Sequence, residues 1–132
     1  MNNLFEYAKV MQQRAHAPYS NFQVGAALQA EESNVIGGCN IENSSYGLTM
    51  CAERVAIANA IAQGHTNFYA LAIVSPTGGY PCGACRQVIS DMCGNIIIYI
   101  CTPHKVVQTI TLNELLPHSF SDKDLQAKEY RS

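Results

Sequence analysis

The sequence has few charged residues and no cluster of basic ones. Only 14% of its residues are charged, its eight Lys and Arg residues are scattered, and the formal net charge is −2. Proteins that bind polyanionic nucleic acid usually carry a basic stripe or cluster. The composition therefore argues against DNA or RNA as a partner.

Long apolar runs are also missing. The longest strongly apolar stretch, residues 96–101, is far shorter than the roughly 20 residues of a membrane-spanning helix, and we interpret it as a buried strand. The N-terminus has neither the basic start nor the apolar stretch of a signal peptide. We expect a cytoplasmic protein that does not associate with membranes.

The remaining composition is that of a folded domain, because 48% of the 132 residues are apolar and can fill a core. Apolar periodicity and the positions of Gly and Pro predict helices over residues 3–16, 49–63, 82–92 and 112–116. They predict strands over residues 23–30, 34–40, 68–74, 95–101 and 106–111. This order predicts an α/β fold, a three-layer α/β/α sandwich with a mixed five-stranded sheet. We expect one domain over residues 1–132, with a tail that frays from about residue 121.

Three of the six cysteines have the spacing and position of metal ligands. Cys51, Cys82 and Cys85 all fall at the predicted start of a helix, where unpaired N–H groups and the helix dipole favour a thiolate. Clustered cysteines in a reducing compartment more often bind metal or do chemistry than form disulfides. Three thiolates leave one coordination position of Zn²⁺ free, as in catalytic zinc sites.

The other cysteines are poor candidates for a fourth ligand. Cys93 lies eleven residues beyond Cys82 on the same predicted helix, which separates them by roughly 16 Å at about 1.5 Å per residue. Cys39 and Cys101 lie in apolar strand patterns and are expected in the core. A Cys-x-x-Cys pair by itself also occurs in zinc ribbons and in dithiol redox proteins, so these alternatives stay open at this point.

Charged neighbours of these cysteines favour the catalytic interpretation. Glu53 lies two residues beyond Cys51, where a carboxylate can shuttle protons for a reaction at the metal; alternatively, it only favours the helix dipole. Three thiolates and Zn²⁺ sum to a charge of −1 (−3 + 2), which a guanidinium would offset. Arg54 and Arg86 are candidates for that role, although either could be an ordinary surface charge.

The segments Cys51-Ala52-Glu53 and Pro81-Cys82-Gly83-Ala84-Cys85-Arg86-Gln87 resemble the motifs of zinc-dependent deaminases, with Cys in place of the His of the nucleic-acid-editing branch. The chain is most similar in these motifs to the small homotetrameric cytidine deaminases. Segments 19–27, 38–47 and 115–120 also resemble that family, so that the similarity runs from about residue 5 to residue 120.

The resemblance implies an enzyme of pyrimidine salvage that hydrolyses cytidine and deoxycytidine to uridine and deoxyuridine plus ammonia. It implies Zn²⁺ held by Cys51, Cys82 and Cys85, with Glu53 as the catalytic residue that transfers protons. The resemblance also implies that Asn40 and Glu42 bind the ribose 3′-hydroxyl, and that Phe22 and the Ala52 N–H contact the base. It implies that Tyr46 and Phe120 contribute to the pocket of a neighbouring subunit. Without the resemblance, the three aromatic residues would be interpreted as ordinary packing residues.

Other functions share parts of this pattern. A deaminase of the same fold that acts on another cytosine nucleoside, such as blasticidin S, would also carry Cys-Ala-Glu and Pro-Cys-x-x-Cys. A non-catalytic zinc-binding module would need a fourth protein ligand. A dithiol oxidoreductase would need no zinc.

Overall fold

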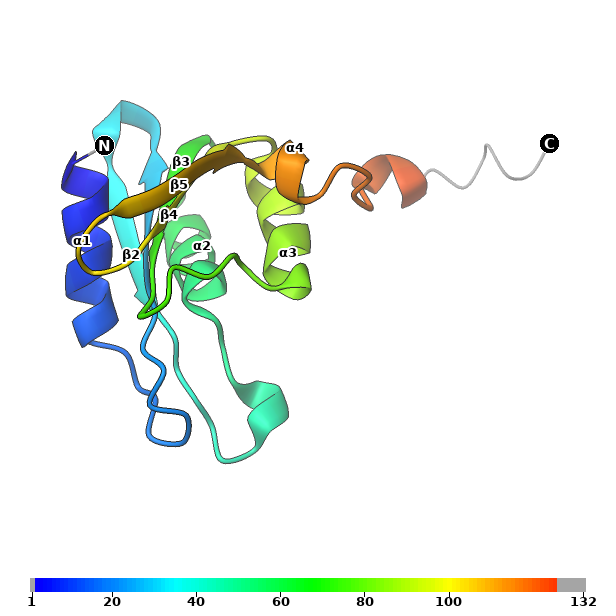
Figure 1. Ribbon diagram of the computed structural model, residues 1–132. Helices are drawn as coiled ribbons and strands as arrows, with labels where there is room; N and C mark the ends of the chain where they lie inside the picture. The colour runs from blue at the N-terminus through cyan, green and yellow to red at the C-terminus, as the bar shows by residue number, and fades with distance from the viewer. Residues whose placement is uncertain (1, 126–132) are drawn as a thin grey trace.

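The computed structural model describes residues 2–125, without the side chains of Asn2 and Glu32. Its helices are α1 (Asn2–Gln13), α2 (Ala52–Ala62), α3 (Gly83–Cys93) and α4 (Leu112–Leu115), and its strands are β1 (Gly25–Ala30), β2 (Val35–Cys39), β3 (Phe68–Val74), β4 (Ile97–Cys101) and β5 (Val106–Thr111) (Figure 1). Short 3-10 helices lie at η1 (Glu31–Ser33), η2 (Tyr46–Leu48) and η3 (Asp122–Leu125). The element types and their order agree with those predicted from the sequence.

The strands form one five-stranded sheet in the order β2-β1-β3-β4-β5. Strands β3 and β4 are parallel, joined by the crossover through α3, and the other three neighbouring pairs are antiparallel. The predicted mixed five-stranded sheet is therefore confirmed. The chain leaves the C-terminal end of β3 in the connection that leads to α3, and this connection carries Cys82.

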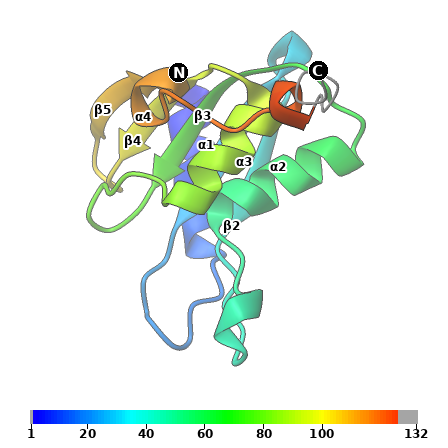
Figure 2. The same ribbon diagram turned by 90° about the vertical axis from the view of Figure 1, so that its right-hand side faces the viewer.

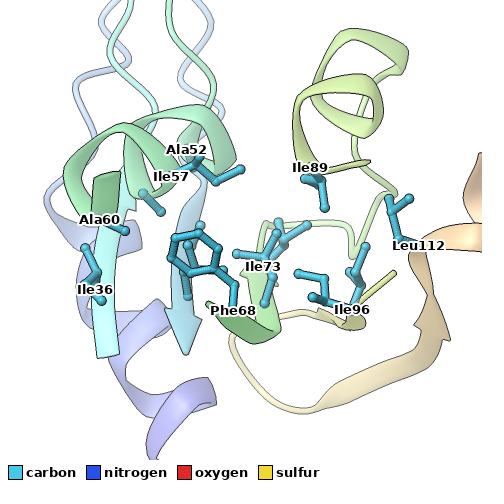
Figure 3. Packing of buried hydrophobic residues seen from close by; sticks show 14 of the residues in the cluster. Ile36, Ala52, Ile57, Ala60, Phe68, Ile73, Ile89, Ile96 and Leu112 are labelled. Carbon is cyan, nitrogen blue, oxygen red and sulfur yellow. The ribbon is translucent and has the colours of Figure 1, made fainter. Parts of the chain in front are cut away.

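Helices cover the sheet on both faces (Figures 1 and 2). Helix α1 packs on β1, β2 and β3, whereas α2 packs on β1 and β2 and lies next to α3. The larger core cluster lies on the α2 and α3 side and includes Ile57, Ile73 and Ile89 (Figure 3). A smaller cluster lies under α1 and includes Leu4 and Ala8. These two apolar layers confirm the predicted α/β/α sandwich.

Two glycines allow helices to pack closely on the sheet: Gly25 lies against α1, and Gly38 lies against the start of α2. A Cβ atom on Gly25 would overlap the main chain of Ala8 and Gln12 in α1, and one on Gly38 would overlap the main chain of Ala52 and Ala56 in α2. Gly38 pairs with Ala26 in the β1–β2 hairpin. The absence of a side chain at Gly38 therefore lets the first turn of α2 rest directly on β2.

Helix α2 begins later than the sequence pattern predicts. Residues 49–63 were predicted to be helical, but the main chains of Met50 and Ile41 exchange two hydrogen bonds of 3.0 and 2.9 Å as an isolated bridge. Cys51 follows with an extended backbone, φ −74° and ψ 150°, as the N-cap of α2. Long-range pairing thus overrides local helix propensity, and it leaves Cys51 at the helix N-terminus.

The C-terminal segment contains more regular structure than we expected. Residues 122–125 form η3, in which the Ser121 N–H donates to Asp124 Oδ2 at 2.8 Å and the Asp124 N–H donates to the Ser121 carbonyl at 2.9 Å. The remainder of the tail expected to fray, residues 126–132, lies outside the described residues.

Within residues 2–125, none of the helices has the length and hydropathy needed to cross a membrane.

Candidate active site

The three cysteines predicted as ligands come together where two helices begin. Cys51 is the N-cap of α2, Cys82 is the N-cap of α3, and Cys85 lies in the first turn of α3. Their Sγ atoms all lie within 4.8 Å of one another. Tetrahedral zinc with Zn–S bonds of about 2.3 Å requires Sγ–Sγ separations of roughly 3.8 Å, which is compatible with a cluster of this size.

The protonation of the cluster also suits a cation. The pKa of Cys51 is lowered to about 5, first because the Cys85 thiol donates a hydrogen bond to it and also because the Arg54 guanidinium lies nearby. The pKa of Cys85 is raised, because its proton is shared with Cys51 and because the side chain is buried. The thiolate is thus favoured at Cys51 before metal binds, and metal binding displaces the proton of Cys85.

The two candidate arginines behave differently. Arg54 Nη2 donates a hydrogen bond to Cys51 Sγ at 3.5 Å. Arg86 donates from Nε to the Pro81 carbonyl at 2.8 Å and from Nη1 to the Leu115 carbonyl at 3.0 Å. Arg54 is therefore the arginine that contacts the Cys51 thiolate, whereas Arg86 ties the turn before Cys82 to α4.

Glu53 is a buried carboxyl group in the first turn of α2, with only 5% of its surface exposed. Burial removes solvating water and raises the pKa of Glu53 to about 7, and the negative charge of Cys51 contributes to the rise. A carboxyl group that titrates near neutral pH can both accept and return a proton. This property distinguishes Glu53 from a carboxylate that only favours the helix dipole.

Glu53 and two of the cysteines border one cavity of about 290 Å³, close to the size of small-ligand pockets. Its walls are formed by Phe22, Val24, Asn40, Thr49, Met50, Cys51, Ala52, Glu53, Ile73, Ser75, Gly79, Tyr80 and Cys82. Phe22, Asn40 and Ala52 were among the predicted substrate contacts. Mostly apolar walls with a few polar groups suit a small, flat, partly polar ligand.

Asn40 and Glu42, the predicted ribose contacts, lie in different hollows. Asn40 borders the cavity, and its side chain accepts a hydrogen bond from the Val24 N–H at 3.0 Å and donates one to the Phe22 carbonyl at 2.8 Å. Glu42 lies in an adjoining hollow of about 360 Å³ that shares only Thr49 with the cavity. Asn40 and Glu42 are therefore two positions apart in the sequence, but in the monomer they border two separate hollows.

Tyr46 and Phe120 do not reach the cavity. Tyr46 is 74% exposed and packs edge-to-face on Tyr19 with ring centroids 6.0 Å apart. Phe120 is 54% exposed and its carbonyl accepts a hydrogen bond from Gln87 Nε2 at 2.7 Å on the flank of α3. A single chain leaves both aromatic rings without a role in its own cavity.

The structure adds a site residue that the sequence reasoning missed. Ser75 is buried, borders the cavity, and accepts hydrogen bonds from the Gly78 and Gly79 N–H groups at 3.0 and 3.2 Å. It thereby shapes the turn that leads from β3 to Cys82. A Ser at the end of a buried strand, followed by Pro and two Gly residues, was the signal available in the sequence.

Comparison with known proteins gives consistent matches. Residues 1–101 match the family described as the cytidine and deoxycytidylate deaminase zinc-binding region. A protein of Sporosarcina psychrophila named cytidine deaminase is 44% identical over 128 residues, covering 95% of this chain and 94% of the relative. A crystal structure of cytidine deaminase from Burkholderia pseudomallei superposes with a TM-score of 0.86 and 43% identity, covering 90% of this chain and 98% of that one. The crystal structure of cytidine deaminase from Mycobacterium tuberculosis superposes with a TM-score of 0.80 and 38% identity, covering 90% of this chain and 95% of that one.

Proposed function

The chain belongs to the cytidine and deoxycytidylate deaminase family, and we propose that it catalyses the zinc-dependent hydrolysis of cytidine and deoxycytidine to uridine and deoxyuridine plus ammonia, in pyrimidine salvage. The observation that carries the proposal is a buried carboxyl group, Glu53, that borders the same cavity as Cys51 and Cys82, two members of the cluster that Cys85 completes. No redox or organic cofactor is needed for this reaction.

The cysteine cluster suits a catalytic zinc better than a structural one. Among residues 2–125 the cluster has three members, and Cys39, Cys93 and Cys101 lie outside it. A structural zinc requires four protein ligands, whereas a catalytic one keeps a position free. Zinc bound at these thiolates supplies a Lewis acid that allows water to act as a nucleophile near neutral pH.

Glu53 performs the proton transfers in this proposal. The cytosine ring of the substrate lies between Phe22 and the start of α2, where the Ala52 N–H can donate a hydrogen bond to its 2-oxo group. As the water oxygen bonds to C4 of the cytosine ring, Glu53 accepts a water proton and passes it to N3. Glu53 then moves the second proton from the new hydroxyl group to the 4-amino group, the C4–N bond breaks and ammonia leaves. A pKa of about 7 suits a group that both takes and gives protons.

Sugar recognition is assigned to Asn40 and Glu42. Their hollows adjoin at Thr49, which is compatible with a nucleoside that places its base in one and its sugar in the other. A site built to bond a hydroxyl group discriminates against analogues that lack it, because its polar groups then stay unpaired. Free cytosine should therefore be a much poorer substrate than cytidine.

The decisive experiment is an ultraviolet assay for loss of cytidine by the pure, zinc-loaded protein, with deoxycytidine, cytosine and blasticidin S as comparators. We expect turnover of both nucleosides, with little turnover of cytosine or blasticidin S. Glu42→Ala should lower kcat/KM for cytidine, whereas Glu6→Ala, at an exposed carboxylate of α1, should not. Absence of cytidine turnover would refute the proposed function, and equal efficiency on cytosine would refute the sugar contacts.

We also propose that the active form is a homotetramer with shared pockets. Large apolar side chains that line the cavity and its neighbouring hollow are exposed, namely Tyr19, Phe22, Tyr46, Met50 and Tyr80. Arg54 Nε is buried and has no hydrogen-bond partner among the described residues. Closed symmetric assembly is the usual way in which such surfaces are covered, and an aromatic ring from a neighbour, Phe120, would stack on the base.

Subunit exchange tests this arrangement directly. A Glu53→Gln chain mixed with a Phe120→Ala chain should regain activity, because some mixed assemblies place an intact Phe120 beside an intact Glu53. Sedimentation should give the mass of four chains. Full activity of a monomer, or no recovery after exchange has been demonstrated by mass spectrometry, would contradict shared pockets.

The cytoplasm is the compartment that we propose for this enzyme. All six cysteines have free thiols, and thiols persist in reducing compartments. Localisation of a fluorescent fusion, together with a thiol count on protein isolated under a trapping reagent, would test this assignment.

A further inference from the structure

The main chain of Phe22 is held by hydrogen bonds on both sides. Its N–H donates to Ser20 Oγ at 3.0 Å, and its carbonyl accepts from Asn40 Nδ2 at 2.8 Å. The Ser20 hydroxyl in turn donates to Glu42 Oε2. The two residues assigned to the sugar, Asn40 and Glu42, are thus both connected to the residue that forms the aromatic wall of the base pocket.

These bonds matter because the hydrogen bonds that hold the rest of this segment are made at Asn21, Gln23 and Val24, whereas Ser20 Oγ is the acceptor for the Phe22 N–H. Residues 21–24 belong to no helix or strand, the Phe22 ring is 41% exposed, and Asn21 has a left-handed backbone with φ 56°. Glu42 Oε1 anchors the preceding turn by accepting the N–H groups of Tyr19 and Ser20 at 3.0 and 3.1 Å. The pKa of Glu42 is lowered, chiefly by the Ser20 hydroxyl, so the carboxylate that makes these bonds is charged near neutral pH.

We propose that Ser20 is a positioning residue, whose hydroxyl group couples the Glu42 carboxylate to the main chain of Phe22. The hydroxyl group has one proton, which it gives to Glu42, and a lone pair that receives the Phe22 N–H. A donor bonded to a carboxylate makes a stronger, better oriented contact than a neutral pair. The sugar site and the base wall then act as one unit, which is an inference that rests on the proposed function.

Ser20→Ala isolates this link, because the two main-chain donors to Glu42 remain. We expect KM for cytidine to rise about 3- to 10-fold, the size of one hydrogen bond, with kcat within about twofold of the parent. Ser20→Thr, which keeps the hydroxyl group, should restore KM. Ser44→Ala is the matched control, since Ser44 is exposed and its side chain makes no hydrogen bond within the described residues.

A double-mutant cycle with Phe22→Leu tests whether Ser20 acts through Phe22. If it does, Ser20→Ala should have a much smaller effect on KM in the Phe22→Leu background than in the parent, because coupled residues are not additive. Fully additive effects, or a normal KM for Ser20→Ala, would overturn the positioning role. An equal rise in KM for Ser44→Ala would also overturn it.

A second measurement does not depend on turnover. Amide hydrogen exchange followed by NMR should show the Phe22 N–H exchanging at least several-fold faster in Ser20→Ala than in the parent and in Ser20→Thr. Unchanged exchange in Ser20→Ala would overturn the link between Ser20 and Phe22 even if the enzyme is active. Loss of the proposed function would instead appear as a parent protein without cytidine turnover, while the exchange result still decides the role of Ser20.

Discussion

Arg54 and Cys51 are joined by a hydrogen bond from the guanidinium Nη2 to Sγ, 3.5 Å long, across the first turn of α2. The bond places a permanent positive charge beside a thiolate and contributes to the lowered pKa of Cys51. The negative charge of Cys51 is therefore offset by a residue of the helix that begins directly after it.

Removal of the Arg54 charge should weaken zinc binding at low pH. In Arg54→Gln the pKa of Cys51 should rise because the guanidinium that lowers it is gone, so that protons compete better with the metal and the pH at which half of the zinc is lost should move upward. Metal content after dialysis across a pH series measures this midpoint. Arg14→Gln, which removes the same charge from the end of α1, is the control, and an unmoved midpoint in Arg54→Gln would contradict the charge-balancing role.

Cys82→Ala should reduce zinc from one ion per chain to a small fraction and abolish turnover, because two thiolates hold the ion much more weakly than three. Metal analysis of the purified variant checks the stoichiometry. Cys93→Ala, which removes a thiol outside the cluster, should keep full zinc occupancy. Full zinc and turnover in Cys82→Ala would show that the ligands are wrongly assigned.

Glu53→Gln should retain zinc but lower kcat by about 10²- to 10⁴-fold, since an amide cannot relay protons. Its unfolding temperature should not fall, because burial of an ionisable carboxyl group costs stability that the amide avoids. Steady-state kinetics and calorimetry of the same preparation measure both effects. Near-normal kcat in Glu53→Gln would exclude Glu53 as the proton carrier; Glu114→Gln, in the exposed cap of α4, serves as the matched substitution.

Glu31 predicts an acid-sensitive contact far from the site. Its carboxylate accepts from His65 Nδ1 at 3.1 Å and from the Asn67 N–H at 2.9 Å, and these bonds lower the pKa of Glu31 below its ordinary value of 4.5. A lowered folded-state pKa gives stability that is fully present above that ordinary value and is lost as the pH falls through the lowered one.

The unfolding temperature of Glu31→Gln should therefore be below that of the parent at pH 6, and the gap should narrow progressively as the pH falls from the ordinary carboxyl pKa of 4.5 through the lowered one. Glu6→Gln is the control, because Glu6 makes only a 3.8 Å ion pair with Lys9 on the surface of α1. Thermal unfolding across the pH series measures the gap. A gap that stays constant with pH would show that the carboxylate charge contributes nothing.

Most element types followed from local sequence, but several boundaries did not: the first helix, for example, was predicted to end at residue 16 and ends at Gln13. Strands such as Phe68–Val74 and Val106–Thr111 were predicted with their observed bounds, because apolar pattern and flanking turn residues act locally. The start of α2 was predicted too early, because the Met50–Ile41 bridge joins residues that are distant along the chain. No local propensity contains that pairing.

Short spacings in the sequence predicted the cysteine cluster and the carboxyl group beside it. Cys51, Glu53, Cys82 and Cys85 lie at helix starts, where a few neighbouring residues define their position. The tertiary structure decided which side chains meet. Packing directs Arg54 to the Cys51 thiolate and Arg86 to two carbonyl groups. Sequence spacing cannot predict such choices, because they depend on how separate elements pack.

By itself, then, the sequence predicted a cluster of three cysteines that could hold zinc, the α/β order and the family resemblance, since these reside in residue type and short spacing. Only the tertiary structure decided that Glu42 lies in a hollow beside the cavity, that Phe120 remains outside it, and that Ser20 bridges Glu42 to Phe22. Those relationships arise where loops between β-strands and helices converge, and the direction of a loop side chain is set by its partners in space rather than by its neighbours in sequence.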